Sequence, residues 1–354
     1  MDASKTSSDT ASMINNDPDI KAAMQPVKDK KGLFSYLPVS LFGSIMGLGA
    51  IAIAWHLASI EFPSIPEWIG FVIGIIATIC LVILIICYFL KIATSFESFK
   101  QEWINPVTKP FFGTFFVSLL IMSIVIYHYN HVLAFIVWII GAIGHTLFAI
   151  YTMNYWLTKK QEMEHITPAW IIPIVGLLDI PLGFRQFGDL FDTSRWGHDL
   201  SVFAFGVGMF YGIPVIVFIM NRLITHSNLA SKILPTRMIL MAPFAVAVSS
   251  YIEITMHIDL FSDVLYAIAI FTFIVLLPQI VSHLNVCPFR FSWWAISFPL
   301  AALAIAAFKI SAHYPDKIEL KALALLFLIV FSLAIIYISV RTLIGVFKGN
   351  LSEL

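Results

Sequence analysis

The sequence predicts an all-α integral membrane protein with ten transmembrane helices, and three observations lead to that prediction. Of the 354 residues, 59% are hydrophobic and only 12% are charged, whereas about 25% of the residues in an ordinary soluble domain are charged. Apolar runs recur along almost the whole chain, and roughly 20 such residues cross a bilayer core as a helix. The stretches between the runs are too short for a soluble domain.

Polar residues, proline and glycine mark the ends of the apolar runs, and these punctuation points set the limits of each expected helix. The ten expected spans, in order, are Leu37–Leu57, Trp68–Leu90, Pro110–Tyr129, Val132–Met153, Pro168–Phe187, Leu200–Met220, Met238–Ile254, Ser262–Ile280, Ser292–Ile310 and Leu320–Val346.

The two ends of the chain differ from this transmembrane domain, which covers residues 37–347. Residues 1–36 are rich in Ser, Thr, Asn and Asp, and such a composition cannot bury a core. We therefore expect a disordered tail over residues 1–36 and a short C-terminal end over residues 348–354.

The distribution of Lys and Arg predicts the orientation. Of the 21 Lys and Arg residues, 16 lie in the tail, in the loops after the even-numbered spans and at the C-terminal end. Short loops rich in these residues stay on the cytoplasmic side. We therefore expect a multi-pass protein of the cell membrane, the inner membrane in a bacterium, with both termini in the cytoplasm.

Odd-numbered and even-numbered spans differ in character. The odd spans carry most of the prolines and small residues, as in "WIIPIVGLLDIPLG" (Trp170–Gly183), although Pro214 lies in the sixth span. Broken helices are tolerated at membrane depth where protein or a water-filled cavity satisfies the freed backbone groups. This pattern favours an inner layer of odd helices around a central path, while close packing through small residues is the alternative explanation.

Four stretches resemble signature sequences of one transport family. They are "LPVSLFGSIMGLGAIAIAW" (Leu37–Trp55), "FESFKQEWINPVTKPFF" (Phe96–Phe112), "MAPFAVAVSSY" (Met241–Tyr251) and "WWAISFPL" (Trp293–Leu300). The family contains the bacterial tellurite-resistance proteins, the slow anion channels of plant guard cells and the fungal malate permeases. The resemblance covers residues 37–347.

The resemblance implies a specific architecture and a gate. It implies five helical hairpins in which an inner ring of five odd helices surrounds a pore, and a homotrimer with one pore in each subunit. It also implies that Phe298, on the ninth helix, plugs the pore. The helix breaker beside this residue, Pro299, would bend its inner helix to make room for the pore, as would its counterparts Pro38, Pro173 and Pro243. Without the resemblance, ordinary packing explains Phe298, because the chain has 31 phenylalanines.

The expected lining of the path contains hydroxyls and no fixed positive charge. The predicted centres of the odd spans contain no Lys or Arg, so any anion binding should be weak. Such a lining suits small anions such as chloride or nitrate, selected by how easily they lose water. The alternative is that these hydroxyls bond to the backbone of their own helices. The candidate polar residues are Ser44, Thr114, Ser118 and Ser249.

Asp179 lies near the middle of the fifth span, where a charge costs about 2.5–3.5 kcal/mol on insertion scales. It could pair with Arg185 only if the helix breaks near Pro181, because a spacing of six residues places the two on different faces. Proton coupling through Asp179 is the second interpretation, and it favours a carrier for malate or another carboxylate, or efflux of a tellurite-related anion. A neutral or locally hydrogen-bonded Asp179 is the third.

Other function classes have little support in the sequence. The chain has no His-Glu-x-x-His and no Gly-x-Ser-x-Gly motif, which mark metalloproteases and serine hydrolases. We therefore expect neither an enzyme nor a metal site, and no cofactor. The formal net charge is zero, so no basic field favours nucleic acid. The expected partners are small anions, the lipid bilayer and further copies of the chain.

Overall fold

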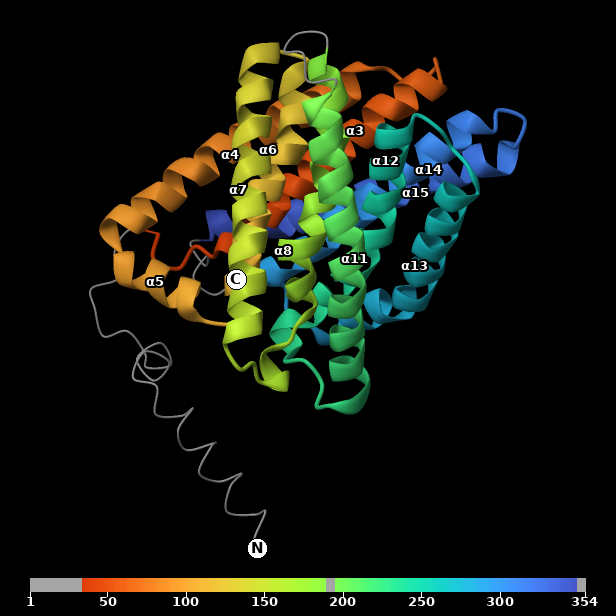
Figure 1. The fold of residues 1–354 in the computed structure, drawn as a ribbon. Helices are drawn as coiled ribbons and strands as arrows, with labels where there is room; N and C mark the ends of the chain where they lie inside the picture. Colours follow the sequence, from red (N-terminus) through yellow and green to blue (C-terminus); the bar gives the residue numbers. More distant parts are fainter. Residues whose placement is uncertain (1–33, 189–194, 349–354) are drawn as a thin grey trace, which may run out of the picture.

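The computed structural model describes residues 34–188 and 195–348, without the side chains of residues 283–286. Its regular secondary structure in the described residues is helical, and ten helical segments are long and apolar enough to cross a membrane (Figure 1). The predicted ten-span helical fold is therefore confirmed. The expected tail and C-terminal end lie outside the described residues, apart from residues 34–36 and Lys348.

Each even-numbered span is a single long helix. These helices extend beyond the predicted apolar runs because their ends continue in polar residues past the hydrocarbon core. They are α4 (Trp68–Thr94), α7 (His131–Thr158), α11 (Trp196–Thr225), α13 (Leu260–Val286) and α15 (Ile318–Phe347).

Each odd-numbered span begins with a 3-10 segment and continues as an α-helix. Four of them combine η1 (Val39–Leu41) with α3 (Phe42–Glu61), η2 (Lys109–Phe111) with α6 (Phe112–Tyr127), η7 (Ser231–Met241) with α12 (Ala242–Thr255), and η8 (Phe291–Ile296) with α14 (Ser297–His313). The fifth span is the most interrupted and consists of η4 (Pro168–Ile171), α8 (Ile172–Val175), η5 (Gly176–Asp179), α9 (Pro181–Phe184) and η6 (Arg185–Phe187).

The odd spans are the buried ones. Between 67% and 89% of the most apolar stretch of each odd span is buried, against 22% to 39% for the even spans. The even helices expose large apolar side chains such as Ile79, Phe210 and Leu333. Lipid tails solvate such side chains as well as a protein core does, so the even helices suit the lipid boundary.

Contacts between the spans follow a regular order. Each odd span packs against the next odd span along the chain, and the ninth span, α14, also packs against the first, α3. Each even helix packs against the odd span that precedes it, as α4 does on α3 and α15 on α14.

One further helix, α5 (Phe96–Ile104), does not cross the membrane. It follows α4 and precedes the third span, at one end of the molecule (Figure 1). With nine residues it is too short to span a bilayer, and the apolar pattern predicts a loop in its place. We call the end of the molecule where α5 lies and where the odd spans begin the α5 side.

Candidate functional site

A cavity lies among the odd-numbered spans on the α5 side, and all five spans contribute to its wall. The space open to water-sized molecules is about 200 Å³. The last wall residue along each span stops short of the far end of that span, so the cavity occupies the first part of the spans. These five residues, one from each odd span, are Met46, Val117, Asp179, Val246 and Pro299.

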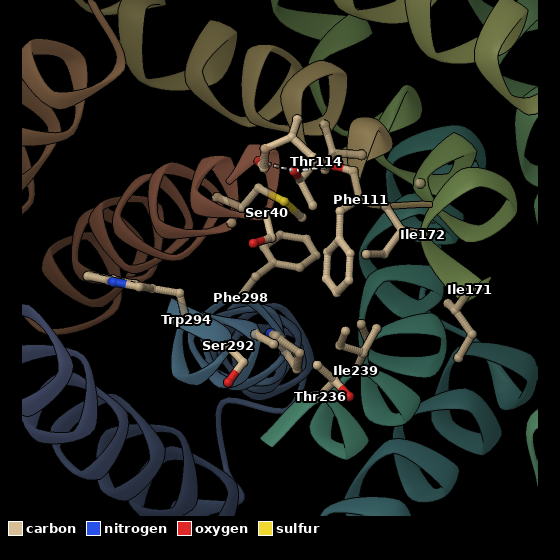
Figure 2. Close-up of a pocket in the computed structure, with 18 of the residues that line it drawn as sticks. Ser40, Phe111, Thr114, Ile171, Ile172, Thr236, Ile239, Ser292, Trp294 and Phe298 are labelled. Carbon is tan, nitrogen blue, oxygen red and sulfur yellow. Dashed lines mark hydrogen bonds between the residues drawn. The ribbon is translucent and has the colours of Figure 1, made fainter. Parts of the chain in front are cut away.

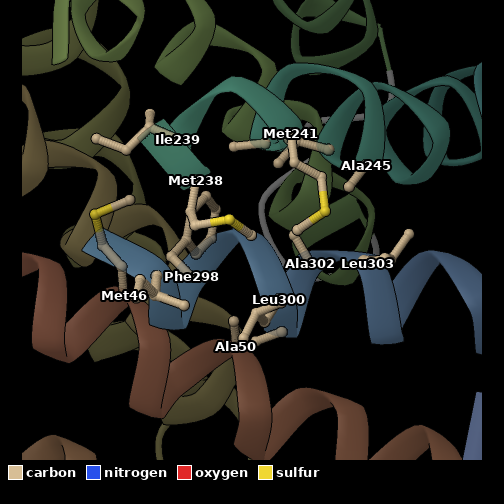
Figure 3. Packing of buried hydrophobic residues seen from close by; sticks show 14 of the residues in the cluster. Met46, Ala50, Met238, Ile239, Met241, Ala245, Phe298, Leu300, Ala302 and Leu303 are labelled. Carbon is tan, nitrogen blue, oxygen red and sulfur yellow. The ribbon is translucent and has the colours of Figure 1, made fainter. Parts of the chain in front are cut away.

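Phe298, the predicted gate, is part of this wall and is the second residue of α14. Its side chain is only 7% exposed. The surrounding cluster of buried apolar residues includes Met46 and Met238, which are drawn with it in Figure 3. Figure 2 shows the rings of Phe298 and Phe111 pointing into the cavity from two different spans. The structure thus brings Phe298 to a space shared by all five odd spans.

The four predicted proline positions lie at the starts of helical segments. Pro173 and Pro243 are second in α8 and α12, Pro299 is third in α14, and Pro38 precedes η1. Proline has no N–H to donate, so the first turn of a helix accepts it without losing a hydrogen bond. In the fifth, seventh and ninth spans the prolines stand where 3-10 geometry changes to α geometry. Of the four, Pro38 and Pro299 line the cavity.

Of the four predicted hydroxyls, Thr114 is the one found in the described cavity wall. It donates to the carbonyls of Phe111 (2.6 Å) and Val39 (3.2 Å). Ser44 and Ser118 each donate 2.7 Å to a carbonyl three residues earlier in their own helices. The remaining residue, Ser249, is buried, and its hydroxyl has no hydrogen-bond partner among the described residues.

Asp179 lines the same cavity as Phe298 and is 2% exposed. Its Oδ1 has no hydrogen-bond partner, and its carboxylate makes no ion pair, among the residues described. The fifth span does break before Pro181. Arg185, however, donates its Nε–H to the backbone carbonyl of Glu253. The structure therefore does not bring Asp179 and Arg185 together in an ion pair.

The far ends of the fifth, seventh and ninth spans meet at Glu253. The carboxylate of Glu253 forms an ion pair with Lys309, while its backbone carbonyl accepts the hydrogen bond from Arg185. The Glu253 carboxylate therefore offsets the charge of Lys309, and the Glu253 backbone holds Arg185 at the same end, opposite the α5 side.

On the α5 side, Glu102 of α5 is a wall residue that the sequence analysis did not single out. Its carboxylate accepts hydrogen bonds from the ammonium of Lys91 (2.7 Å), the hydroxyl of Tyr88 (2.9 Å) and the backbone N–H of Val39 (2.6 Å). The ion pair is buried, because the Lys91 and Glu102 side chains are 3% and 10% exposed. The stretch "FESFKQEWINPVTKPFF" contains two acidic residues, Glu97 and Glu102, and the sequence does not show which of them meets Lys91.

The ionisable side chains in the described cavity wall are acidic: Glu102, which is paired with Lys91, and Asp179. No Lys or Arg is among the described residues of the cavity wall. The long α-helices of the odd spans, α3, α6, α12 and α14, begin on the α5 side. The N-terminus of a helix carries the equivalent of roughly half a positive charge. Four helix dipoles therefore point their positive ends toward this end of the molecule, and this potential is spread over the cavity rather than fixed at one atom.

Comparison with known proteins places this arrangement in context. The chain is 28% identical over 281 residues to the tellurite resistance protein TehA homolog of Haemophilus influenzae, over 77% of this chain and 80% of that protein. It is 27% identical over 281 residues to an uncharacterized transporter of Methanocaldococcus jannaschii, over 74% of this chain and 81% of that protein. It is also 27% identical over 293 residues to the S-type anion channel SLAH3 of Arabidopsis thaliana. That match covers 79% of this chain but only 44% of the plant channel.

A family-wide match covers most of the ten-span domain. The sequence model described as SLAC1, voltage-dependent anion channel, matches residues 36–343. This range begins just before η1 and ends within α15, so it takes in every odd span and the cavity between them. The chain therefore belongs to the SLAC1 family of voltage-dependent anion channels.

Proposed function

We propose that this protein is a gated anion channel that passes small anions such as chloride or nitrate down their gradients. The five odd spans form a ring around a central pore, and Phe298 plugs that pore. The observation that carries the proposal is the position of Phe298, because its ring enters a cavity whose wall all five odd spans share. The contact order of the odd spans, in which the ninth returns to the first, supports the ring.

A weak attraction spread over the cavity wall supports passage of an anion, whereas a fixed positive charge would bind the anion tightly. A buried Lys or Arg in the pore would hold an anion too firmly for rapid exit, and no such residue is among the described wall residues. The N-termini of the odd-span helices supply a favourable potential. Anions that lose their water easily should therefore pass best.

The energy of the gate is consistent with regulated opening. Burying a phenylalanine side chain contributes about 1.5–3 kcal/mol, so moving Phe298 away from its neighbours costs an energy of that order. At about 1.4 kcal/mol for each factor of ten, the closed state exceeds the open state by roughly ten- to a hundredfold. An opening signal of a few kcal/mol would then be sufficient.

The decisive experiment is anion current across a bilayer containing the purified protein. Phe298→Ala should raise chloride and nitrate currents roughly ten- to a hundredfold over the parent, by the burial energy of one phenylalanine. The matched control is Phe271→Ala on α13, because Phe271 is 67% exposed on a lipid-facing helix. That control should conduct like the parent. Equal currents in the parent and in Phe298→Ala would refute the gate.

Asp179 supports a second candidate function, a proton-coupled carrier for malate or another carboxylate, or for a tellurite-related anion. A buried carboxyl with an unpartnered Oδ1 in the same cavity is suited to take up a proton when an anion enters. This carrier would show saturable flux driven by a pH gradient, and Asp179→Asn would abolish the pH dependence. Large, non-saturating currents in Phe298→Ala favour the channel instead.

The proposal includes the setting of the channel. The α5 side faces the cytoplasm, because most Lys and Arg residues flank the spans there, and the protein resides in the cell membrane as a homotrimer with one pore in each subunit. The trimer is what the resemblance of the four signature stretches implies. Labelling of a Lys348→Cys variant by a thiol reagent added to one or the other side of a sealed vesicle tests the orientation. The mass of the purified protein particle tests the trimer.

A further inference from the structure

A second space lies outside the cavity of the odd spans, between α4, α5, α6 and α7. Its volume open to water-sized molecules is about 470 Å³, larger than that of the first cavity. Aromatic rings make up much of its wall, among them Phe42, Tyr88, Phe99, Trp103 and Tyr151. We call this space the aromatic pocket.

The aromatic pocket faces the lipid. Two of its wall residues, Phe89 on α4 and Leu147 on α7, are 64% and 61% exposed, and both helices belong to the exposed even spans. In a membrane, the molecules that meet such a surface are lipids. An apolar pocket of this size opening toward them suits an acyl chain, because aromatic side chains offer large apolar contact areas.

A buried cation lies next to the aromatic pocket. Lys109 is 5% exposed, and its Nζ lies 3.5 Å from the ring centroid of Tyr155 and 5.9 Å from that of Tyr151, which is itself a wall residue. Lys109 makes no ion pair with any described residue. Contacts with aromatic faces recover part of the lost hydration, but an ammonium group in this position still favours a negatively charged partner.

We propose that the aromatic pocket binds one acyl chain of an anionic phospholipid and that Lys109 holds its phosphate headgroup. Lys109 is the first residue of the third span, so it lies at the level where lipid headgroups begin. The acyl chain then extends along α6 toward Phe115 and Leu147. Charge and shape therefore select the same ligand, an apolar chain with an anionic head.

A lipid bound in the aromatic pocket would contact α5, which also borders the cavity of the odd spans. Within α5, Phe99 and Trp103 line the aromatic pocket, whereas Glu102 lines the cavity of the odd spans and bonds to the N–H of Val39. Val39 belongs to both walls. A lipid in the aromatic pocket would thus rest against the start of the first span.

The test uses Trp103 as a reporter, because its ring is part of the pocket wall and stacks on Tyr151 with ring centroids 5.3 Å apart. The full chain is placed in vesicles that contain increasing fractions of brominated phosphatidylglycerol or brominated phosphatidylcholine. Bromine quenches tryptophan fluorescence at short range, and the difference between the parent and Trp103→Phe isolates the signal of Trp103.

The site predicts a preference that depends on one lysine. Half-maximal quenching of Trp103 should require about fivefold less brominated phosphatidylglycerol than brominated phosphatidylcholine. The reason is that one lysine near a membrane surface contributes about 1 kcal/mol to the binding of an anionic lipid. Lys109→Gln should remove this preference, and Lys109→Arg should keep it. Lys100→Gln is the matched control, because Lys100 is exposed on α5, and it should keep the preference as well.

Two outcomes would overturn the proposal. Equal quenching by both lipids in the parent would mean that ordinary boundary lipid fills the pocket without recognition of its headgroup. No quenching of Trp103 would mean that protein, such as a second copy of the chain, covers the pocket. Neither measurement uses anion conduction, so the lipid site and the proposed channel function can fail independently.

Discussion

Lys91 and Glu102 form a buried ion pair with an N–O distance of 2.7 Å, which ties the end of α4 to α5. Lys91 also donates to the carbonyl of Leu37 (2.7 Å), and Glu102 accepts from the N–H of Val39. The pair therefore connects three elements at the start of the first span. The pair thereby satisfies the carbonyl of Leu37 and the N–H of Val39, backbone groups at the start of the first span that would otherwise lack hydrogen-bond partners.

Removing the charge of Glu102 should destabilise the protein. Glu102→Gln leaves the Lys91 ammonium buried without its counter-ion, a change that costs about 3–5 kcal/mol in buried pairs. We expect a lower unfolding temperature in detergent, with Glu97→Gln, an exposed α5 residue, as an unaffected control. The double variant Lys91→Met/Glu102→Gln should recover part of the loss. If Glu102→Gln unfolds like the parent, the pair does not stabilise α5.

At Gly47, α3 packs closely against Ser297 of α14, just beside the proposed gate. A methyl group added at Gly47 would collide with the side chain of Ser297, the residue before Phe298. Gly47→Ala should therefore lower the free energy of unfolding by about 1–3 kcal/mol through overpacking. Gly43→Ala is the control, because nothing lies within 4 Å of a methyl group there, and its stability should equal or exceed that of the parent.

The same prediction can be checked by rescue. Gly47→Ala/Ser297→Gly removes the colliding side chain and should regain most of the lost stability in thermal unfolding. If the double variant is as unstable as Gly47→Ala, the loss arises from a cause other than this contact.

Asp259 gives stability a dependence on pH. The hydroxyl of Tyr251 donates to its carboxylate (2.7 Å), and this bond, followed by the N–H of Ser262, lowers the pKa of Asp259. A carboxyl with a lowered pKa stabilises the fold above its unfolded pKa, about 3.9 for Asp, and this contribution disappears as the pH falls through the folded value.

Asp259→Asn should therefore be less stable than the parent at pH 7, and this difference should shrink as the pH falls below the unfolded value of about 3.9. Asparagine keeps the capping ability of the side chain at the start of α13, so the comparison isolates the charge. Thermal unfolding in detergent across this pH range provides the measurement, and a difference that stays constant with pH would contradict it.

Glu253 should restrain anion flux at the end opposite the α5 side. Glu253→Gln frees the charge of Lys309 and removes one negative charge near Arg185, which should raise the local anion concentration. In the Phe298→Ala background we expect a current increase of about twofold or more at 10 mM salt and almost none at 1 M, where screening is nearly complete. Glu319→Gln, exposed at the start of α15, should change little, and a salt-independent increase would argue against an electrostatic cause.

Several features of the fold could be predicted from local sequence. Apolar run length alone located the ten spans, and the fifth span even has its predicted limits, Pro168 and Phe187. The excess of proline and small residues indicated which spans are buried. α5 was missed, because its nine residues are too few to produce an apolar run, and its role depends on contacts made by Glu102 and Trp103 with other helices.

The candidate site was only partly predictable. A signature stretch pointed to Phe298, and the structure places this residue in the shared cavity wall. Ser44 and Ser118 looked equally suited to line a path, but their hydroxyls bond within their own helices. Sequence spacing gives the face of a helix on which a residue lies, but not which neighbouring helix meets that face.

The number of spans, their limits to within seven residues, and the family could be read from the sequence, because these depend on apolar length and short motifs. The pairing of charges, such as Glu102 with Lys91 and Glu253 with Lys309, is visible only in the folded chain. The same folding brings Asp179 and Phe298 to one cavity. The reason is physical, since hydrophobicity acts locally along a chain, whereas ion pairs and cavities arise between segments that only folding brings together.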